Sequence, residues 1–346
     1  MQNILDLTRE ELSQWFENRG IRSFRANQIF RWLYLNLAED FDSMTDLGKA
    51  LRATLTDHFT LETMTLVDKQ TSADTTEKFL HCLSDGELVE SVLIPGKNNF
   101  TLCVSSQVGC AMDCHFCLTA KNGLKRNLTM GEIIAQVRDA RIYVKSLGHD
   151  PLKLSNLVFM GMGEPLANYN QLIRALAVLC DTDYGMKFST RRVTVSTSGL
   201  VPKIPKLGLD TDVNLAISLN ATDNETRSKL MPINDTYPIE DLLAACRNFS
   251  MKPRKKITFE YILMAGINDS DEDARRLVKL LTPIRAKVNL IPFNAHEGAP
   301  YKRPSRERIE GFLKILLDRD MTAIIRKSKG DDISAACGQL KAKQQL

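Results

Sequence analysis

The sequence lacks any long apolar run. Its longest, such as 157–160, fall far short of the roughly 20 residues that a membrane-spanning helix needs. The first residues do not combine a basic segment with an apolar stretch, so we expect no secretory signal peptide. We also find neither an internal repeat nor a low-complexity segment. These absences favour an ordinary globular protein without a membrane anchor.

The composition sets further bounds. A chain of 346 residues can form one large domain with an appendage, or two domains. The net charge of +4 permits nucleic-acid binding but does not argue for it. Eight cysteines without an export signal suggest reduced thiols and cofactor chemistry rather than a disulfide framework. We therefore expect a cytoplasmic protein.

Three of the cysteines carry the strongest signal. Cys110, Cys114 and Cys117 form the pattern CxxxCxxC. A structural zinc site is closed by four ligands, whereas a [4Fe–4S] cluster held by three thiolates keeps one iron open. The alternatives are a zinc knuckle that includes His115, or simply buried thiols. His115 stands between the last two cysteines, where it would crowd a chelate rather than complete one.

The cysteine pattern, with Phe116 before the last cysteine, resembles the cluster motif of the radical S-adenosylmethionine (SAM) superfamily. The resemblance implies that the open iron is chelated by the amino and carboxylate groups of SAM. It also implies that an electron from the cluster splits SAM to a 5′-deoxyadenosyl radical.

The hydrophobic pattern divides the chain into three parts. Residues 1–60 show helical periodicity and carry Arg19, Arg22, Arg25 and Arg31, which could share one helical face. Residues 61–98 are β-rich, and the pair Asp85-Gly86 between two apolar runs predicts a hairpin. Residues 99–340 form the predicted catalytic core.

Strands and helices alternate in this core, which predicts parallel βαβ units and a partial (β/α)6, TIM-like barrel of the α/β class. A capping box at Thr129 and Glu132 marks the start of the first helix. We expect strands at 100–105, 157–160, 192–197, 213–219, 256–263, 286–291 and about 321–326. We expect helices at about 129–147, 168–180, 238–249, 270–281 and 304–319.

Several motifs stand at the predicted strand ends, where chemistry gathers in such barrels. Gly163 and Glu164 follow one strand, and a carboxylate there can hold an ammonium group. By resemblance to radical SAM enzymes, we assign both to SAM. Neutral hydrogen-bonding groups at the other strand ends suit ribose, carboxylate or adenine contacts, although each alone could be a local turn or cap. They are Ser196, the segment Ser218-Leu219-Asn220, and Asn294.

Two further cysteines are candidates for chemistry. Cys103 lies on the strand before the cluster motif, and Cys337 lies in a polar tail beside Gly338 and Gln339. A free cysteine is usually a small buried hydrophobe, which suits Cys337 poorly. A thiol near pKa ~8.5 needs modest help to become a nucleophile.

Longer segments make the resemblance specific, because they are similar to those of the RlmN family of radical SAM RNA methyltransferases over nearly the whole chain. These segments are 101–110, 161–165, 192–199, 289–294 and 326–340. The resemblance implies methylation of carbon-2 of an adenosine in the peptidyl-transferase centre of 23S rRNA. For some members of the family, the resemblance also implies methylation of the adenosine next to the anticodon of tRNA. One SAM supplies a methyl group and a second SAM supplies the radical.

The same resemblance assigns roles to single residues. Cys337 becomes S-methylcysteine, its methylene radical adds to the adenine, and Cys103 resolves the thioether by forming a disulfide with Cys337. Glu90 corresponds to the proton acceptor, although such a glutamate on a half-exposed strand would otherwise be a solvent-facing carboxylate. Asn220 stands where relatives often carry histidine, so a titrating role is doubtful there while the SAM assignment survives.

The partners follow from the substrate. Because RNA recognition favours unpaired bases, we expect a splayed adenosine to enter the barrel while Arg19, Arg22 and Arg25 grip phosphates. A flavodoxin-type electron donor and a monomeric protein are expected. Three alternatives stay open: a Cfr-type enzyme that methylates carbon-8, a non-enzymatic Fe–S RNA-binding protein, and a radical enzyme for a small molecule. Pro165 and the segment 326–330 favour the RlmN type over the first.

Overall fold

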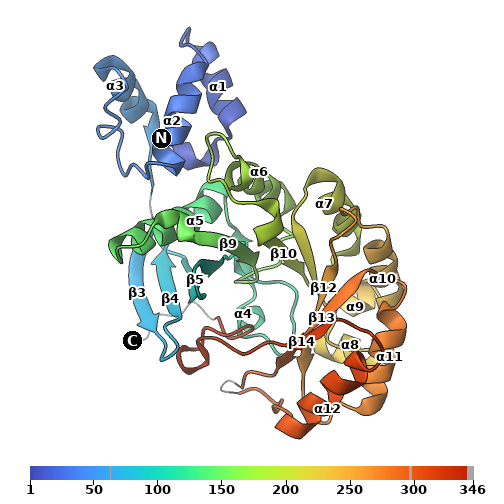
Figure 1. Cartoon of the computed structure of the whole chain (residues 1–346). Helices are drawn as coiled ribbons and strands as arrows, with labels where there is room; N and C mark the ends of the chain where they lie inside the picture. Colours follow the sequence, from blue (N-terminus) through green and yellow to red (C-terminus); the bar gives the residue numbers. More distant parts are fainter. Residues whose placement is uncertain (63, 296–297, 341–346) are drawn as a thin grey trace.

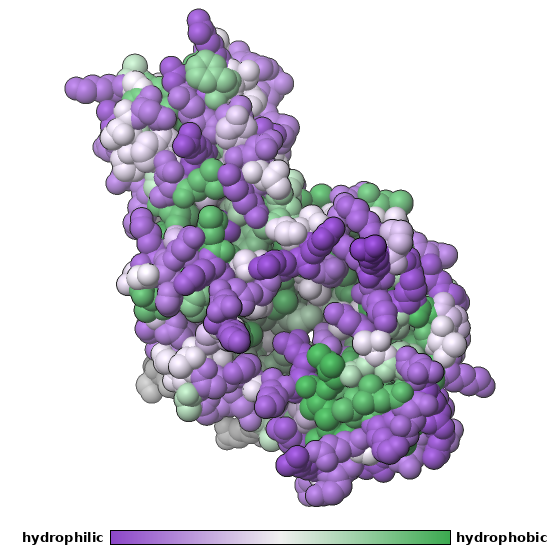
Figure 2. Space-filling model, viewed as in Figure 1, coloured by the Kyte–Doolittle hydropathy of each residue, from purple (hydrophilic) through white to green (hydrophobic). Residues whose placement is uncertain are grey.

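The computed structural model describes residues 1–62, 64–295 and 298–340. The N-terminal part is a module of three helices, α1 (Arg9–Glu17), α2 (Phe24–Tyr34) and α3 (Lys49–His58). A short parallel pair, β1 (Gln2–Asn3) with β2 (Phe59–Thr60), joins its two ends. The module stands out from the wider body of the molecule, and hydrophilic side chains cover much of its visible surface (Figures 1 and 2).

The expectation that four arginines share one helical face is wrong. Arg19 lies in the turn after α1, Arg22 lies in the loop, and Arg25 and Arg31 lie on α2. The helix ends at Glu17 because the chain turns there through Gly20, which has a φ of +68°. Arg19 instead stacks on Trp15, with its guanidinium carbon 3.9 Å from the ring centroid.

The main body is built on one ten-stranded sheet, in the order β14-β13-β12-β11-β10-β9-β6-β5-β4-β3. Its seven parallel strands are β6 (Phe100–Cys103), β9 (Leu154–Phe159), β10 (Val193–Thr197), β11 (Asn214–Ser218), β12 (Ile257–Leu263), β13 (Ala286–Pro292) and β14 (Ala323–Ile325). Three antiparallel strands extend it: β3 (Thr65–Thr71), β4 (Glu77–Cys82) and β5 (Leu88–Pro95).

Helices connect the parallel strands and lie on the outside of the curved sheet (Figure 1). They are α5 (Met130–Ser146), α6 (Tyr169–Cys180), α7 (Ile204–Asp210), α8 (Asn224–Leu230), α9 (Ile233–Thr236), α10 (Ile239–Arg247), α11 (Asp271–Leu281) and α12 (Arg306–Leu317). The barrel is open, because β3 and β14 form the two edges of the sheet and do not pair with each other. Of the helices in the described ranges, none combines the length and apolar character needed to cross a membrane.

The expected α/β barrel is confirmed, and each of its predicted strands and helices has a counterpart within a few residues. The hairpin at Asp85-Gly86 joins β4 to β5, and the capping box at Thr129 and Glu132 starts α5. The sequence patterns missed β3 and the short helices α7 to α9. Strand β3 is mostly polar and largely exposed at the sheet edge, so it has no alternating apolar signal.

A small antiparallel pair, β7 (Gln107–Gly109) and β8 (Leu124–Asn127), forms the base of the loop with the three cysteines. Between the two strands lie this loop, residues 110–117, hereafter the cluster loop, and α4 (Leu118–Lys121). A Cβ atom at Gly109 would stand 1.9 Å from the carbonyl oxygen of Gly123, so only glycine permits this close approach. The amide of Cys110 donates to the same oxygen at 2.9 Å.

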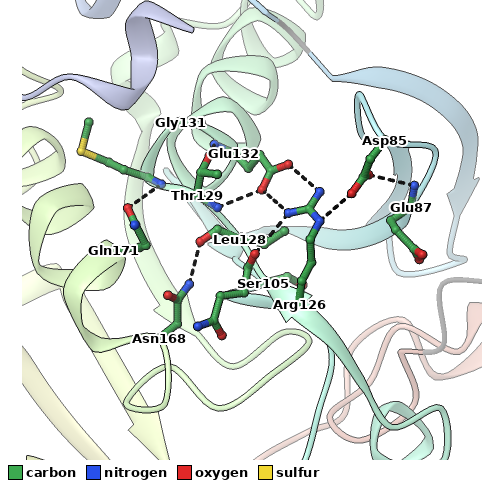
Figure 3. A network of polar contacts seen from close by, with 12 residues as sticks. Asp85, Glu87, Ser105, Arg126, Leu128, Thr129, Gly131, Glu132, Asn168 and Gln171 are labelled. Carbon is green, nitrogen blue, oxygen red and sulfur yellow. Dashed lines mark hydrogen bonds and ion pairs between the residues drawn. The ribbon is translucent and has the colours of Figure 1, made fainter. Parts of the chain in front are cut away.

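Arg126 fixes this base to the rest of the protein (Figure 3). Its guanidinium donates to both carboxylate oxygens of Glu132, each at 2.8 Å, and to Asp85 at 2.6 Å. Glu132 belongs to the capping box of α5, and Asp85 belongs to the β4–β5 turn. One side chain therefore joins the cluster-loop base, the first barrel helix and the antiparallel extension by charge-assisted bonds.

Candidate active site

One pocket at the carboxyl end of the parallel strands brings most of the predicted site residues together. Its lining includes five thiols: Cys103, Cys110, Cys114, Cys117 and Cys337. The cavity is about 190 Å³, below the roughly 300–1,000 Å³ of a typical ligand pocket. Residues 326–329, 335–338 and 340 also line it, so the C-terminal chain occupies part of the space beside the strand ends.

The cluster loop presents its three thiols to this pocket. Asp113 in the loop has a left-handed φ of 48°, and Cys117 caps the N-terminus of α4. Burial raises the pKa of Cys110 to about 12 and raises that of Cys114, so a cation is needed to hold both as thiolates.

The thiol arrangement fits a cluster better than a single ion. In the described part of the chain, no three histidine, cysteine or acidic side chains are placed to hold one metal ion. An iron–sulfur cluster binds each cysteine through a different iron, so its ligands stand further apart than those of one ion. The three thiols of the cluster loop line one pocket, where each could bind a different iron.

Glu164 lies at the end of β9 and is buried with 3% exposure. One carboxylate oxygen accepts from the amide of Leu166, and the other accepts from the amide and hydroxyl of Ser198 at 2.8 Å each. Burial raises the pKa of Glu164 and these bonds oppose the rise. These three donors therefore hold the carboxylate firmly at the pocket wall.

The glycines beside Glu164 stand where the chain packs too closely for a side chain. Gly163 has a φ of +95°, and a Cβ there would stand 2.5 Å from Cβ of Gln107. A Cβ at Gly161 would stand 2.7 Å from Oγ of Ser105. Both glycines thus allow the strand end to pack against the segment that leads to the cluster loop, which brings Glu164 next to the thiols.

Of the residues predicted to bind SAM at the next two strand ends, most line the pocket and one lies in the core. Ser196, Ser218 and Asn220 line the pocket. Leu219 does not, because its side chain is completely buried in the core and its carbonyl already accepts from Arg227 at 3.2 Å. Asn220 has a left-handed φ of 57°, and its Oδ1 accepts from the amide of Ile262 at 2.9 Å. Its side chain is therefore used mainly to hold the neighbouring strand.

Asn294 connects the pocket to the C-terminal chain. Its amide nitrogen lies 3.5 Å from the carbonyl oxygen of Cys337, and its oxygen accepts from the hydroxyl of Ser328. Residues 326–340 are hereafter the Cys337 tail. Gln339 adds a bond to the carbonyl of Ala295 at 3.0 Å. The position of the tail thus decides whether Asn294 is free to meet a ligand.

The two pocket cysteines outside the cluster loop both have a raised pKa, so they ionise less readily than a free thiol. Burial raises the pKa of Cys103 to about 12, and the neighbouring Cys337 adds to the rise. Cys337 is accessible from the pocket, yet the protein atoms around it also raise its pKa, while Arg326 opposes the change. Each thiol therefore needs a neighbouring cation to ionise. Arg326 is the cation that favours the thiolate of either residue.

Glu90 lies outside this lining. It is buried on β5 with 4% exposure, so the expectation of a half-exposed strand is wrong. Its carboxylate lies 3.4 Å from the ammonium of Lys78, and both side chains are almost completely buried. Val92 and Cys103 are register partners, so Glu90, two residues before Val92, faces the same side of the sheet as Cys103.

The N-terminal arginines lie on the separate helical module and do not contribute to the pocket. Sequence reasoning also missed three buried or tail residues of the main body: Glu260, Arg326 and Lys78. Glu260 could have been noticed, because it is the one charged residue in the apolar strand Ile257–Leu263. Lys78 and Arg326 gave no such signal, since lysines and arginines on strand ends and tails are usually solvated.

Two family models match the chain. The model described as the ribosomal RNA large subunit methyltransferase N-terminal domain matches residues 2–61. The model of the radical SAM superfamily matches residues 104–278. The first therefore covers the helical module, and the second covers the cluster loop, the barrel strands β9 to β12 and most of α11.

Several relatives match over nearly the full length of this chain. A dual-specificity RNA methyltransferase RlmN from Desulfosudis oleivorans is 58% identical over 99% of this chain and 91% of its own. One of the same name from Syntrophotalea carbinolica is 51% identical over 99% of this chain and 90% of its own. The crystal structure of a radical SAM methyltransferase from Sphaerobacter thermophilus superposes with a TM-score of 0.92 at 45% identity, covering 99% of this chain and all of that one.

Proposed function

The chain belongs to the RlmN family of radical SAM RNA methyltransferases, and from this premise we propose that it methylates carbon-2 of an adenosine in 23S rRNA. The target is the adenosine in the peptidyl-transferase centre, and the adenosine next to the anticodon of tRNA is a second substrate. The observation that carries the proposal is the convergence of three cluster-loop thiols, Cys103 and Cys337 on one pocket.

The pocket residues divide into those that hold the cofactors and those that act on RNA. Cys110, Cys114 and Cys117 would hold the [4Fe–4S] cluster. Glu164, Gly163, Ser196, Ser218, Asn220 and Asn294 surround SAM, and Leu219 serves only to place its neighbours. When bound, the cluster and SAM supply a methyl group and a radical that abstracts hydrogen.

Cys337 carries the carbon that reaches the RNA. Its thiolate, favoured by Arg326, accepts the methyl group, and the same carbon then bonds to carbon-2 of the adenine. Cys103 attacks the sulfur of Cys337, so that a disulfide forms and the sulfur–carbon bond breaks; the carbon keeps the electron pair of that bond and takes up a proton from solvent, which completes the methyl group on the released base. An external thiol reductant restores both thiols before the next turnover.

Glu90 is the acceptor for the proton that leaves carbon-2. Support comes from its burial on the sheet face that also carries Cys103, and from Lys78, which holds the carboxylate in place. The carboxylate must come closer to the base than the pocket lining places it, and the bound RNA would bring this about.

The helical module supplies RNA affinity. Arg19 and Arg22 are exposed and Arg25 is half exposed, so all three can reach phosphates. A flavodoxin-type protein in the cytoplasm supplies electrons, and the enzyme acts as a monomer.

The test is an anaerobic reaction of the reconstituted, reduced enzyme with SAM and a protein-free 23S rRNA fragment or tRNA. Mass spectrometry of the digested RNA separates 2-methyladenosine from 8-methyladenosine by retention time. We expect 2-methyladenosine from both RNAs. Formation of 8-methyladenosine would indicate the Cfr-type reaction, and SAM cleavage without any RNA product would exclude both RNAs as substrates.

A further inference from the structure

Glu260 is a buried carboxylate in the middle of β12, with 4% of the residue exposed. Its register partners are Ser218 on β11 and Asn289 on β13, and Ser218 lines the pocket as Glu260 does. Register partners in adjacent strands direct their side chains to the same face of a sheet. Glu260 therefore points into the barrel, on the wall shared with Cys103 and Cys337.

The two carboxylate oxygens of Glu260 are in different states. Oε1 accepts a hydrogen bond from the side-chain amide of Asn289 at 2.9 Å. Oε2 is buried and has no hydrogen-bond partner among the described residues. A buried carboxylate oxygen without a donor is costly to keep, so its retention at a pocket wall indicates a donor that arrives with a ligand.

The surroundings keep this carboxylate available as an acceptor. Burial raises the pKa of Glu260, while Arg326 on the same pocket and the bond from Asn289 oppose the rise. Arg326 acts on Glu260 through its charge, and Oε2 stays without a hydrogen-bond partner among the described residues, so Arg326 balances the charge without occupying that oxygen. The pocket thus holds one acceptor oxygen that is oriented by Asn289 and free to bind.

The chemistry of adenine selects what can meet this oxygen. An ionised carboxylate only accepts hydrogen bonds. The ring nitrogens of adenine also accept, and its one donor group is the 6-amino group. The 6-position of guanine or hypoxanthine carries an oxygen instead, which a carboxylate would repel.

We propose that Oε2 of Glu260 accepts a hydrogen bond from the 6-amino group of the target adenine, which makes Glu260 a specificity-determining residue. This assignment rests on the proposed function, since it requires an adenine in the pocket. It explains why the buried Oε2 is kept without a donor inside the protein. It also gives the enzyme a means to reject a 6-oxopurine at the same position.

The experiment compares RNA fragments whose target nucleotide is adenosine, purine riboside (which lacks the amino group) or inosine, under reducing, anaerobic conditions with SAM. For wild type, we measure kcat/KM for each. In Glu260→Ala, we expect the ratio of adenosine to purine riboside to fall by roughly 10- to 100-fold, the value of one hydrogen bond to a charged group. Comparing ratios cancels the different intrinsic reactivity of the two bases.

Glu260→Gln provides a second variant of nearly the same shape. Asn289 would still donate to the amide oxygen, so the amide NH₂ would face the pocket and meet the 6-amino group donor to donor. We expect the ratio of inosine to adenosine to rise at least roughly tenfold over wild type. Thr258→Val, two residues earlier on the same face of β12 and outside the pocket lining, is the control and should keep every wild-type ratio.

Three results would overturn the assignment. Unchanged ratios in both Glu260 variants would show that the carboxylate does not read the base. Loss of 5′-deoxyadenosine formation in the absence of RNA would assign Glu260 to SAM. A wild-type penalty for a 2′-deoxyadenosine target, absent in the variants, would make the ribose hydroxyl the donor. If wild type methylates none of the RNAs, the proposed function itself fails and this assignment falls with it.

Discussion

The two cysteines that meet in the pocket are held in opposite ways. Cys103 ends β6 and pairs in register with Val92 of β5 and Val158 of β9, so a strand lies on each side of it. Cys337 lies in a tail with no regular strand, and side-chain bonds and turns hold it. The backbone ladder fixes Cys103, whereas Cys337 depends on contacts that can be broken one at a time.

One set of contacts that hold the tail comes from the β3–β4 turn. Asp332 of the tail accepts from the hydroxyl of Ser72 at 2.5 Å and from the amide of Ala73 at 3.0 Å. In return, Asp74 of the turn accepts from the amide of Gly330 at 3.4 Å and lies 3.4 Å from the ammonium of Lys329. We call this exchange the tail clasp; in Figure 1 the chain after β14 runs back across the barrel opening toward β3 and β4.

The difference matches the tasks proposed for the two thiols. A resolving thiol gains from a fixed position, because the reacting sulfur must be attacked along one line. A thiol that carries a methyl group must face SAM first and RNA later, so its support has to be weak enough to release. Partly exposed polar contacts such as the clasp contribute little each, which suits a segment that moves.

The largest effects on methylation are expected from cysteine variants in the cluster loop and in the tail, and a second measurement distinguishes the two. We expect Cys114→Ala and Cys337→Ala each to lower RNA methylation by at least about 1,000-fold, because one loses a cluster ligand and the other the carbon carrier. Iron content and uncoupled SAM cleavage, measured after reconstitution, should fall only in Cys114→Ala. Loss of iron in Cys337→Ala would mean that the tail is part of the cluster site and not a separate carrier.

The next largest effect is a loss of stability, expected from variants in the strands that support Cys103. Lys78→Met removes the ammonium that lies 3.4 Å from the buried carboxylate of Glu90, and we expect the unfolding free energy to fall by about 3 kcal/mol. Adding Glu90→Gln should restore much of that stability while methylation stays low. Urea unfolding of the two single variants and the double variant measures this coupling, and additive losses would show that the pair is not coupled.

A pH-dependent change in the free energy of unfolding, of similar or smaller size, is expected from His81 on β4. Burial lowers the pKa of His81 to about 4 from 6.5, so below pH 6.5 the unfolded chain binds a proton that the folded chain does not. The stability this contributes is complete above pH 6.5 and is lost between 6.5 and 4, up to about 3 kcal/mol. His81→Phe should flatten the pH dependence of urea unfolding over that range, whereas His58→Phe, on the exposed surface of α3, should not.

The smallest effect is expected in the tail clasp. Asp332→Ala removes two hydrogen bonds from an exposed carboxylate, and we expect kcat to fall about tenfold with little change in unfolding free energy. Asp318→Ala, which removes an exposed carboxylate beside Lys314 on α12, is the matched control. Equal rates for Asp332→Ala and wild type would show that the clasp does not position Cys337.

The sequence predicted the features that depend on neighbours along the chain. The Asp85-Gly86 hairpin, the capping box at Thr129 and the polar residues at strand ends are local patterns, and the structure contains all of them. Alternating strands and helices were enough to predict the parallel barrel, because a crossover helix between strands allows few other arrangements.

Features made by distant residues could not be predicted in this way. The bond between Ser72 and Asp332 joins positions 260 residues apart, and nothing local to either residue indicates it. The burial of Glu90 depends on Lys78 on the next strand, and the free oxygen of Glu260 depends on Asn289. Such pairs become visible only when the register of the sheet is known.

The most direct test of the division between a fixed and a movable cysteine is to trap the covalent intermediate. Reduced, cluster-loaded Cys103→Ala would be incubated anaerobically with SAM and the 23S rRNA fragment, digested, and sequenced by mass spectrometry. We expect an adenosine linked through its carbon-2 to Cys337, with no methylated RNA released. Free 2-methyladenosine from Cys103→Ala, or a linkage at any other residue, would contradict the assignment of Cys337 as carrier and Cys103 as the resolving thiol.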